Sequence, residues 1–143
     1  MAPDEFQPNV LIVEDQEGPR KALLMILSSF YRIFTAETAS AALKIIGESP
    51  IDLVIMDVGL PDISGLELLR RVRASGQAVK VIVVTGRGSL ESAEEAMRLG
   101  AVAYLLKPFN LLEVLELVQQ GVKTSAAELA LRLPMSTRAV SPR

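Results

Sequence analysis

The chain has 143 residues, with 15 lysines and arginines against 17 acidic residues, which gives a formal net charge of -2. One hydrophobic core fits this length, whereas a core plus a full second domain does not. Without an excess of positive charge, direct binding of nucleic acid or of an anionic membrane is not expected. The sequence has no cysteine and no histidine, which excludes disulfides, thiolate zinc sites and imidazole bases. Any chemistry must therefore use carboxylates, hydroxyls and amines.

We expect neither a membrane segment nor a leader in this sequence. No apolar run approaches the roughly 20 residues that span a bilayer, and residues 1–7 are acidic rather than basic and then apolar. We therefore expect a soluble, cytoplasmic protein. Residues 1–7 are interpreted as an N-terminal extension, residues 8–124 as one domain, and residues 125–143 as a helical extension that leads into a disordered tail or linker.

Five short apolar runs recur along the chain, with the length and β-branched content of buried strands. They cover residues 10–13, 31–34, 51–56, 79–84 and 101–106. The alternation of these runs with helical stretches predicts a parallel sheet that is covered by helices on both faces. Right-handed crossovers then favour a doubly wound α/β fold with strand order 2-1-3-4-5, which is the flavodoxin-like topology.

Helix boundaries have their own signals. Ser64 with Glu67 and Asn110 with Glu113 have the spacing of helix starts, and glycines at 76 and 100 stand where helices should end. The last helix is expected to begin near Asn110, with room to continue to about Arg132. Its core-facing stripe is predicted to consist of Leu111, Leu115, Val118 and Val122, while Leu112, Val114 and Leu117 form either a wider stripe or an apolar docking face.

Polar residues follow the apolar runs at the edge of the predicted sheet where ligands of this fold bind. They are Glu14 and Asp15, Asp57, Thr85 and Lys107. Three gathered carboxylates repel one another and require a cation, so Glu14, Asp15 and Asp57 suit Mg²⁺. The Asp57 carboxylate is placed to act as a nucleophile toward phosphorus. Lys107 would pair with Asp57 at rest and with a phosphoryl oxygen afterwards, and Thr85 would donate its hydroxyl to another phosphoryl oxygen.

Each of these residues also has an ordinary structural explanation when it is taken alone. An acidic pair such as Glu14 and Asp15 is common in solvated turns, and Asp57 could cap the next helix. A threonine at a strand end, as Thr85 is, more often has a structural role. Functional use is favoured because independent structural roles do not predict these residue types together at four strand ends of one sheet.

Four segments carry a resemblance to a known family, and it covers about residues 8–124. They are Val10–Asp15 (VLIVED), Asp52–Asp57 (DLVIMD) followed by Leu60, Pro61 and Gly65, Val83–Gly86 (VVTG), and Gly100–Phe109 (GAVAYLLKPF). Together they resemble the receiver domains of two-component response regulators, the superfamily that includes the chemotaxis regulator. In this family a histidine kinase or a histidine phosphotransfer protein donates the phosphoryl group, which is consistent with the absence of histidine here.

The resemblance implies a role for each matched position. Asp57 is the phosphoacceptor, and Mg²⁺ is held by Glu14, Asp15, Asp57 and the backbone carbonyl of Gly59. Thr85 and Lys107 contact the phosphoryl group. The resemblance also implies that the peptide bond between Lys107 and Pro108 is cis.

A switch is implied as well. In receiver domains the threonine moves inward on phosphorylation and an aromatic residue of the last strand takes the vacated space; here these residues are Thr85 and Tyr104. The alternative for Tyr104 is a static half-buried ring. The face formed by the fourth helix, fifth strand and fifth helix would then signal to a downstream output domain or protein, or to a second copy in a phosphorylation-dependent homodimer. Val102 and Ala103 replace the acidic residues of many symmetric receiver dimers, which weakens the case for a charged dimer seam.

Three other functions compete with this interpretation. A haloacid-dehalogenase-like phosphatase needs a second aspartate two residues after the nucleophile, where this chain has Gly59. A flavodoxin-like electron carrier needs a hydroxyl- and glycine-rich phosphate loop after the first strand, whereas residues 14–17 are mainly acidic. A pseudo-receiver would bind partners without phosphorylation, although all the matched positions are present. We expect a switch that catalyses only its own aspartyl phosphorylation and dephosphorylation, either alone or as part of a longer protein.

Overall fold

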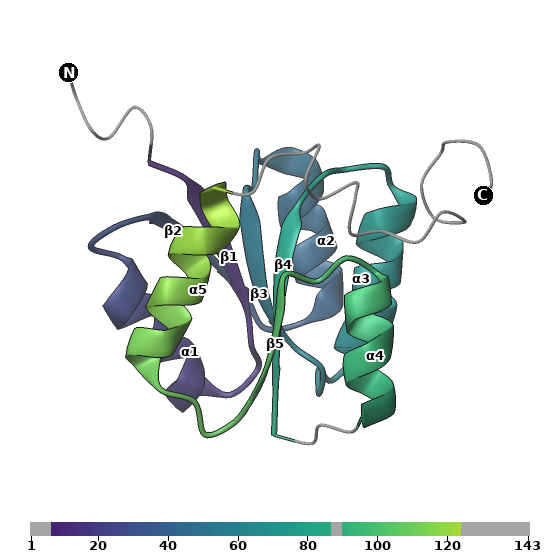
Figure 1. Cartoon of the computed structure of the whole chain (residues 1–143). Helices are drawn as coiled ribbons and strands as arrows, with labels where there is room; N and C mark the ends of the chain where they lie inside the picture. Colours follow the sequence, from purple (N-terminus) through teal and green to yellow (C-terminus); the bar gives the residue numbers. More distant parts are fainter. Residues whose placement is uncertain (1–6, 87–89, 124–143) are drawn as a thin grey trace.

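The computed structural model describes residues 7–86 and 90–123, which form a five-stranded parallel sheet with the order β2-β1-β3-β4-β5 (Figure 1). The sheet order is the one predicted from the sequence. The elements in chain order are β1 (Asn9–Val13), α1 (Glu17–Leu27), β2 (Arg32–Ala36), α2 (Ala39–Glu48), β3 (Leu53–Asp57), α3 (Gly65–Ala74), β4 (Lys80–Thr85), α4 (Leu90–Arg98), β5 (Ala103–Leu106) and α5 (Leu111–Lys123). Every strand begins and ends within two residues of its predicted run.

The helices cover both faces of the sheet, with α1 and α5 on one face and α2, α3 and α4 on the other (Figure 1). Successive side chains of a strand point to opposite faces. In β1, for example, Val10 packs with the α1 and α5 side while Leu11 packs with the α2, α3 and α4 side. Because both faces are buried, the strands consist of continuous apolar runs, and polar groups are left at the two edges where the strands begin and end.

Side-chain caps start two of the helices at the predicted positions. The Ser64 hydroxyl accepts a hydrogen bond of 3.1 Å from the backbone N–H of Glu67, and the Asn110 side-chain oxygen accepts one of 2.8 Å from the backbone N–H of Leu112. Each cap satisfies a donor that the first turn of a helix leaves without an intrahelical partner. These caps fix where α3 and α5 leave the carboxyl edge of the sheet.

Glycines permit the tight backbone paths at three helix ends. Gly76 and Gly100 have φ angles of 82° and 84° directly after α3 and α4, the left-handed conformation that commonly ends helices. Gly65 opens α3 beside the end of β3, where an added Cβ would overlap the carbonyl oxygen of Asp57 and lie 2.8 Å from the Cα of Val58. The absence of a side chain at position 65 therefore lets α3 begin directly against the loop that follows Asp57.

The apolar stripe of α5 has a different centre from the predicted one. Val114, Val118 and Gly121 are buried against the sheet, while Leu111, Leu115 and Val122, placed in the stripe from the sequence, are only half-buried at its border. Val114 therefore belongs to the core, and Leu112 is 65% exposed. The expected continuation to Arg132 and the tail lie outside the described residues. Within residues 7–86 and 90–123, no helix has the length and apolar character needed to cross a membrane.

Candidate functional site

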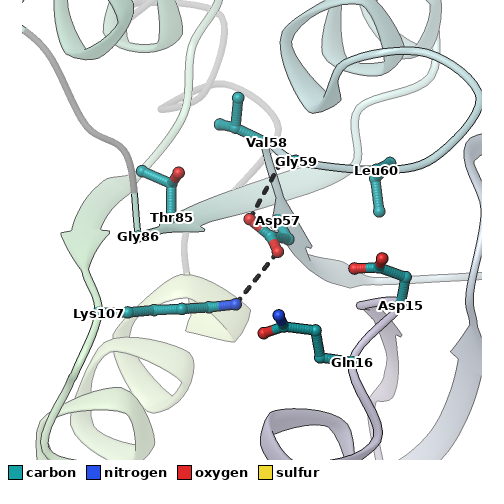
Figure 2. Close-up of a pocket in the computed structure, with 9 residues that line it drawn as sticks. All are labelled: Asp15, Gln16, Asp57, Val58, Gly59, Leu60, Thr85, Gly86 and Lys107. Carbon is teal, nitrogen blue, oxygen red and sulfur yellow. Dashed lines mark hydrogen bonds and ion pairs between the residues drawn. The ribbon is translucent and has the colours of Figure 1, made fainter.

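The residues predicted to act together meet at the carboxyl edge of the sheet. Glu14 follows β1, Asp57 and Thr85 are the last residues of β3 and β4, and Lys107 follows β5. An open cavity of about 430 Å³ lies at this edge (Figure 2). Its lining consists of Asp15, Gln16, Asp57, Val58, Gly59, Leu60, Thr85, Gly86 and Lys107. Parallel strands place these side chains together because all of their carboxyl ends reach the same edge.

Asp57 points into this cavity from the end of β3 (Figure 2). Its side chain is almost fully buried, and Oδ1 accepts a hydrogen bond of 3.1 Å from the backbone N–H of Gly59. The loop that follows is fixed by a bond of 2.8 Å from the N–H of Gly65 to the carbonyl oxygen of Val58. A Cβ added at Gly59 would lie 4.0 Å from Asp57 Oδ1, and apart from its chain neighbours no other described residue comes within that distance, so the space beside the carboxylate is open.

Lys107 joins two carboxylates that come from different strands. Its ammonium nitrogen lies 2.6 Å from Oε1 of Glu14 and 3.1 Å from Oδ2 of Asp57. Burial by itself would lower the pKa of Lys107, but the hydrogen bonds to the two carboxylates outweigh burial and raise that pKa. The ammonium is therefore firmly protonated at neutral pH. Pairing with Asp57 was predicted from the sequence, whereas the closer contact with Glu14 was not.

Glu14 is the most deeply buried carboxylate of the site, with 1% of its surface exposed. Its Oε2 accepts a hydrogen bond of 3.2 Å from the backbone N–H of Gln16. Burial raises the pKa of Glu14, and the hydrogen bonds from Lys107 and from the Gln16 N–H offset only part of this rise. The buried carboxylate therefore depends on Lys107, or on another cation, to stabilise its charged form.

Arg20 holds the backbone of the acidic pair, a role that the sequence analysis missed. From the start of α1 its guanidinium donates to the carbonyl oxygens of Glu14, at 3.1 Å, and Asp15, at 3.2 Å. These bonds fix the direction in which the two carboxylates leave β1. The sequence feature that indicates such a role is a basic residue in the first turn of the helix that follows the acidic pair.

One carboxylate oxygen from each of Glu14, Asp15 and Asp57 lies within 4.8 Å of the other two. Oxygen-only ligands at such separations are those that a hard divalent cation such as Mg²⁺ takes. Glu14 and Asp57 are buried whereas Asp15 is exposed, so the cluster faces the cavity from which water could complete the coordination. These three carboxylates therefore fit a site for a divalent cation.

Thr85 and Tyr104, the two predicted switch residues, lie on neighbouring strands. Thr85 is buried at the cavity, and its carbonyl oxygen accepts a hydrogen bond of 2.8 Å from the Lys107 N–H. Tyr104 is half-buried, and its hydroxyl oxygen lies 2.6 Å from Oγ of Ser92 in α4. The peptide bond between Lys107 and Pro108 is cis.

Comparison with known proteins identifies the family. A family model described as the response regulator receiver domain matches residues 10–119. The chain belongs to this family. It is 41% identical over 105 residues to the transcriptional regulatory protein MalR of Bacillus subtilis, covering 71% of this chain and 45% of MalR. It is 37% identical over 121 residues to the transcriptional regulatory protein FixJ of Azorhizobium caulinodans, covering 83% of this chain and 57% of FixJ. The chain thus spans about half the length of these two relatives.

Shorter relatives and solved receiver domains match over most of their own length. Sporulation initiation phosphotransferase F of Bacillus subtilis is 33% identical over 112 residues, which make up 78% of this chain and 90% of that protein. A CheY-like receiver domain from Methanospirillum hungatei superposes with a TM-score of 0.77 at 32% identity, covering 81% of this chain and 94% of the other. The beryllofluoride-activated NtrC4 receiver domain dimer gives 0.76 at 32% identity, covering 80% and 96%. The receiver domain described here is therefore a phosphorylation-activated switch of two-component signalling.

Proposed function

We propose that Asp57 accepts a phosphoryl group from a histidine kinase or a histidine phosphotransfer protein, and that the modified domain changes its binding to a partner through the α4, β5 and α5 face. The observation that carries this proposal is the position of the Asp57 carboxylate in an open cavity, next to the carboxylates of Glu14 and Asp15 and 3.1 Å from the ammonium nitrogen of Lys107. An Asp57 oxygen would form the new bond to phosphorus while the bond from phosphorus to the donor imidazole nitrogen breaks.

The acidic cluster supports a metal-dependent reaction. Glu14, Asp15 and Asp57 would hold Mg²⁺ together with the carbonyl oxygen of Gly59, and the ion when bound would neutralise charge on the transferring phosphoryl group. Lys107 would leave Glu14 and pair with a phosphoryl oxygen. Thr85 would donate its hydroxyl to another oxygen of the same group.

The switch we propose follows from the charge that is added. An aspartyl phosphate places roughly -1.5 to -2 charges and three acceptor oxygens at the carboxyl edge, enough to draw the nearby Thr85 hydroxyl inward. In the sheet register Thr85 pairs with Leu106 and Val83 with Tyr104, so the threonine and the tyrosine lie on adjacent strands two positions apart. Movement of Tyr104 toward the space that Thr85 vacates would transmit the change to α4.

The chemistry we propose is confined to phosphorylation and dephosphorylation of the chain itself, without turnover of another substrate. The partners would be the phosphodonor protein and an output domain or protein. A phosphorylation-dependent homodimer is a further candidate, because the NtrC4 receiver domain has been solved as an activated dimer. We propose no direct contact with nucleic acid or membrane, in keeping with the net charge of -2, and we propose a cytoplasmic location.

The proposal is tested by incubating the protein with Mg²⁺ and acetyl phosphate and measuring the intact mass. We expect one added phosphoryl group that is stable in acid, labile in base and absent when EDTA removes the metal. Asp57→Asn preserves the size of the side chain and should abolish the adduct. Labelling that persists in Asp57→Asn would contradict the assignment, and complete absence of an adduct in the wild-type protein would favour a pseudo-receiver.

A further inference from the structure

The helix α4 is weakly anchored by apolar contacts. Among its residues only Ala96 is buried, whereas α3 buries the three apolar side chains of Leu68, Leu69 and Val72. Leu90 and Met97 of α4 are 77% and 44% exposed. Because buried apolar area supplies most of the free energy that holds a helix on a sheet, α4 has the smallest share of this stabilisation. Its position must therefore depend more strongly on polar contacts.

Within the part of the chain that the structure describes, two polar side-chain contacts join α4 to α3 and β5. Oγ of Ser92 lies 2.6 Å from the Tyr104 hydroxyl on β5. Glu95 accepts from the Arg70 guanidinium on α3, with 2.9 Å between Nε and Oε2 and a second, shorter contact from the terminal nitrogen. Beside these ties, a cavity of about 430 Å³ is lined by Leu66 of α3 and by Glu91, Ser92, Glu95 and Arg98 of α4. Open space on the α3 side leaves room for α4 to shift once the ties break.

The C-terminal end of α4 is held in a different way. The buried guanidinium of Arg73 donates to the carbonyl oxygens of Leu99, at 2.7 Å, and Gly100, at 3.3 Å, directly after the helix. It also donates to the carbonyl oxygen of Val79 before β4, at 2.6 Å. A cation at a helix C-terminus is favourable for the helix dipole, and three simultaneous bonds from one buried group resist displacement. This end of α4 is therefore fixed to α3 and to the sheet.

We propose that α4 is a lever whose C-terminal end is fixed by Arg73 and whose resting position is held by the Arg70–Glu95 and Tyr104–Ser92 contacts, so that these two contacts oppose activation. The inference rests on the proposed function, because it assumes that Tyr104 moves toward Thr85 after phosphorylation. That movement would break the Tyr104–Ser92 bond. Arg70 and Ser92 act here as positioning residues, since neither touches the phosphorylation site.

Thermodynamic linkage fixes the sign of the expected effect. A contact made only in the resting state lowers the population of the active state, and its removal raises the affinity for any ligand that binds the active state. A hydroxyl hydrogen bond or an exposed ion pair typically changes an equilibrium between about twofold and tenfold. A residue that merely stabilised the fold would give the opposite result, because loosening the domain would weaken ligand binding.

The test uses beryllofluoride with Mg²⁺ as a stand-in for the phosphoryl group and measures its dissociation constant by calorimetry. Tyr104→Phe removes one tie and Arg70→Gln removes the other. Arg71→Gln is the matched control, because among the described residues the ion pair of Arg71 is with Glu67 of α3 itself, at 3.2 Å. We expect each tie variant to bind beryllofluoride about two- to tenfold more tightly than wild type, and the control to be unchanged.

Amide hydrogen exchange without beryllofluoride provides a second readout. Amides of α4 should exchange faster in Tyr104→Phe and Arg70→Gln, whereas those of Gly100 and Ala101, which bond to the carbonyls of Met97 and Ala96, should keep their protection. The lever proposal would be wrong if both variants bound beryllofluoride as tightly as wild type or more weakly. It would also be wrong if Arg71→Gln changed the dissociation constant by the same factor as the two variants. If wild type itself fails to bind beryllofluoride, the proposed function fails, and that result is distinct from failure of the lever alone.

Discussion

The ammonium nitrogen of Lys107 lies 2.6 Å from Oε1 of Glu14, closer than its approach of 3.1 Å to Asp57. The protonated Lys107 thus pairs with two of the carboxylates that a divalent cation would need as ligands. Two unit charges 4 Å apart interact by about 4 kcal/mol at an intermediate effective dielectric, and side-chain motion and salt reduce this value. Lys107→Met should therefore raise the affinity for Mg²⁺ by about tenfold, or about 1.4 kcal/mol.

Calorimetric titration of Mg²⁺ measures this change, with Lys123→Met as the control. Lys123 ends α5 and carries the same charge without belonging to the acidic cluster. The control should leave the affinity within about twofold of wild type, as expected for a screened remote charge. Weaker Mg²⁺ binding in Lys107→Met would mean that the lysine organises the carboxylates for the metal more than it competes with it.

Asp62 caps a helix that precedes it in the chain. Its two carboxylate oxygens accept hydrogen bonds from the backbone N–H groups of Ala39, at 3.0 Å, and Ser40, at 2.9 Å, in the first turn of α2. These bonds lower the pKa of Asp62 below its usual 3.8. Because the folded state holds this proton less tightly than the unfolded state, the stabilisation is present above pH 3.8 and is lost as the pH falls through the lowered pKa.

Asp62→Asn should therefore be less stable than wild type at pH 6, and the difference should shrink as the pH falls below 3.8. Urea unfolding midpoints measured from pH 6 down to acid pH give this difference directly. An Asp62→Asn deficit that stayed constant over the whole range would show that the carboxylate charge contributes nothing to the cap.

The sequence predicts which residues meet at the carboxyl edge, but it does not predict how they pair. Parallel strands of known order place Glu14, Asp57 and Lys107 at one edge whatever the side-chain conformations are. The Lys107–Glu14 contact joins positions 93 residues apart, and it depends on the reach of a flexible side chain across two strands. The cap that Asp62 provides for α2 likewise depends on tertiary packing, because no local motif links the two.

The phase of α5 is the other feature for which the prediction from sequence periodicity differed from the structure. Apolar residues occupy seven of its thirteen positions, so several stripes of helical period fit equally well. Gly121 resolves the choice, because a Cβ there would lie 2.5 Å from Cδ1 of Leu53 in β3. The helix approaches the sheet most closely at this glycine, and Val114 and Val118 share its face.

Gly65 and Gly47 should respond to alanine with opposite signs. At Gly65 a Cβ would overlap the carbonyl oxygen of Asp57, and backbone cannot yield as a flexible side chain does. Gly65→Ala should cost about 1–3 kcal/mol of unfolding free energy and slow phosphorylation by acetyl phosphate, because the backbone of Asp57 must shift. Gly47 lies in α2, and apart from its own helix no described residue has an atom within 4 Å of an added Cβ, so Gly47→Ala should stabilise by about 0.4–1 kcal/mol.

Denaturant unfolding and the phosphorylation rate, measured on both variants, test the contrast. Gly47→Ala serves as the control for the change in chain entropy and should phosphorylate at the wild-type rate. A Gly65→Ala protein with wild-type stability and rate would show that α3 can move away from β3 without affecting the site.

Replacing Arg73 should lower the stability of the fold strongly, because this arginine is buried and donates to three carbonyl oxygens. Burial lowers its pKa to about 10, so the guanidinium remains charged at neutral pH. Arg73→Met has similar length but would leave those carbonyls without their donor, at a cost of about 3 kcal/mol. Arg73→Lys should recover part of the loss, since one ammonium cannot reach all three acceptors with the geometry of the planar guanidinium.

Guanidinium chloride unfolding checks this order of stability. The control is Arg71→Met, at an exposed position, which is expected within about 0.5 kcal/mol of wild type. Equal stability of Arg73→Met and Arg71→Met would mean that desolvation of the Arg73 charge cancels the contribution of its hydrogen bonds.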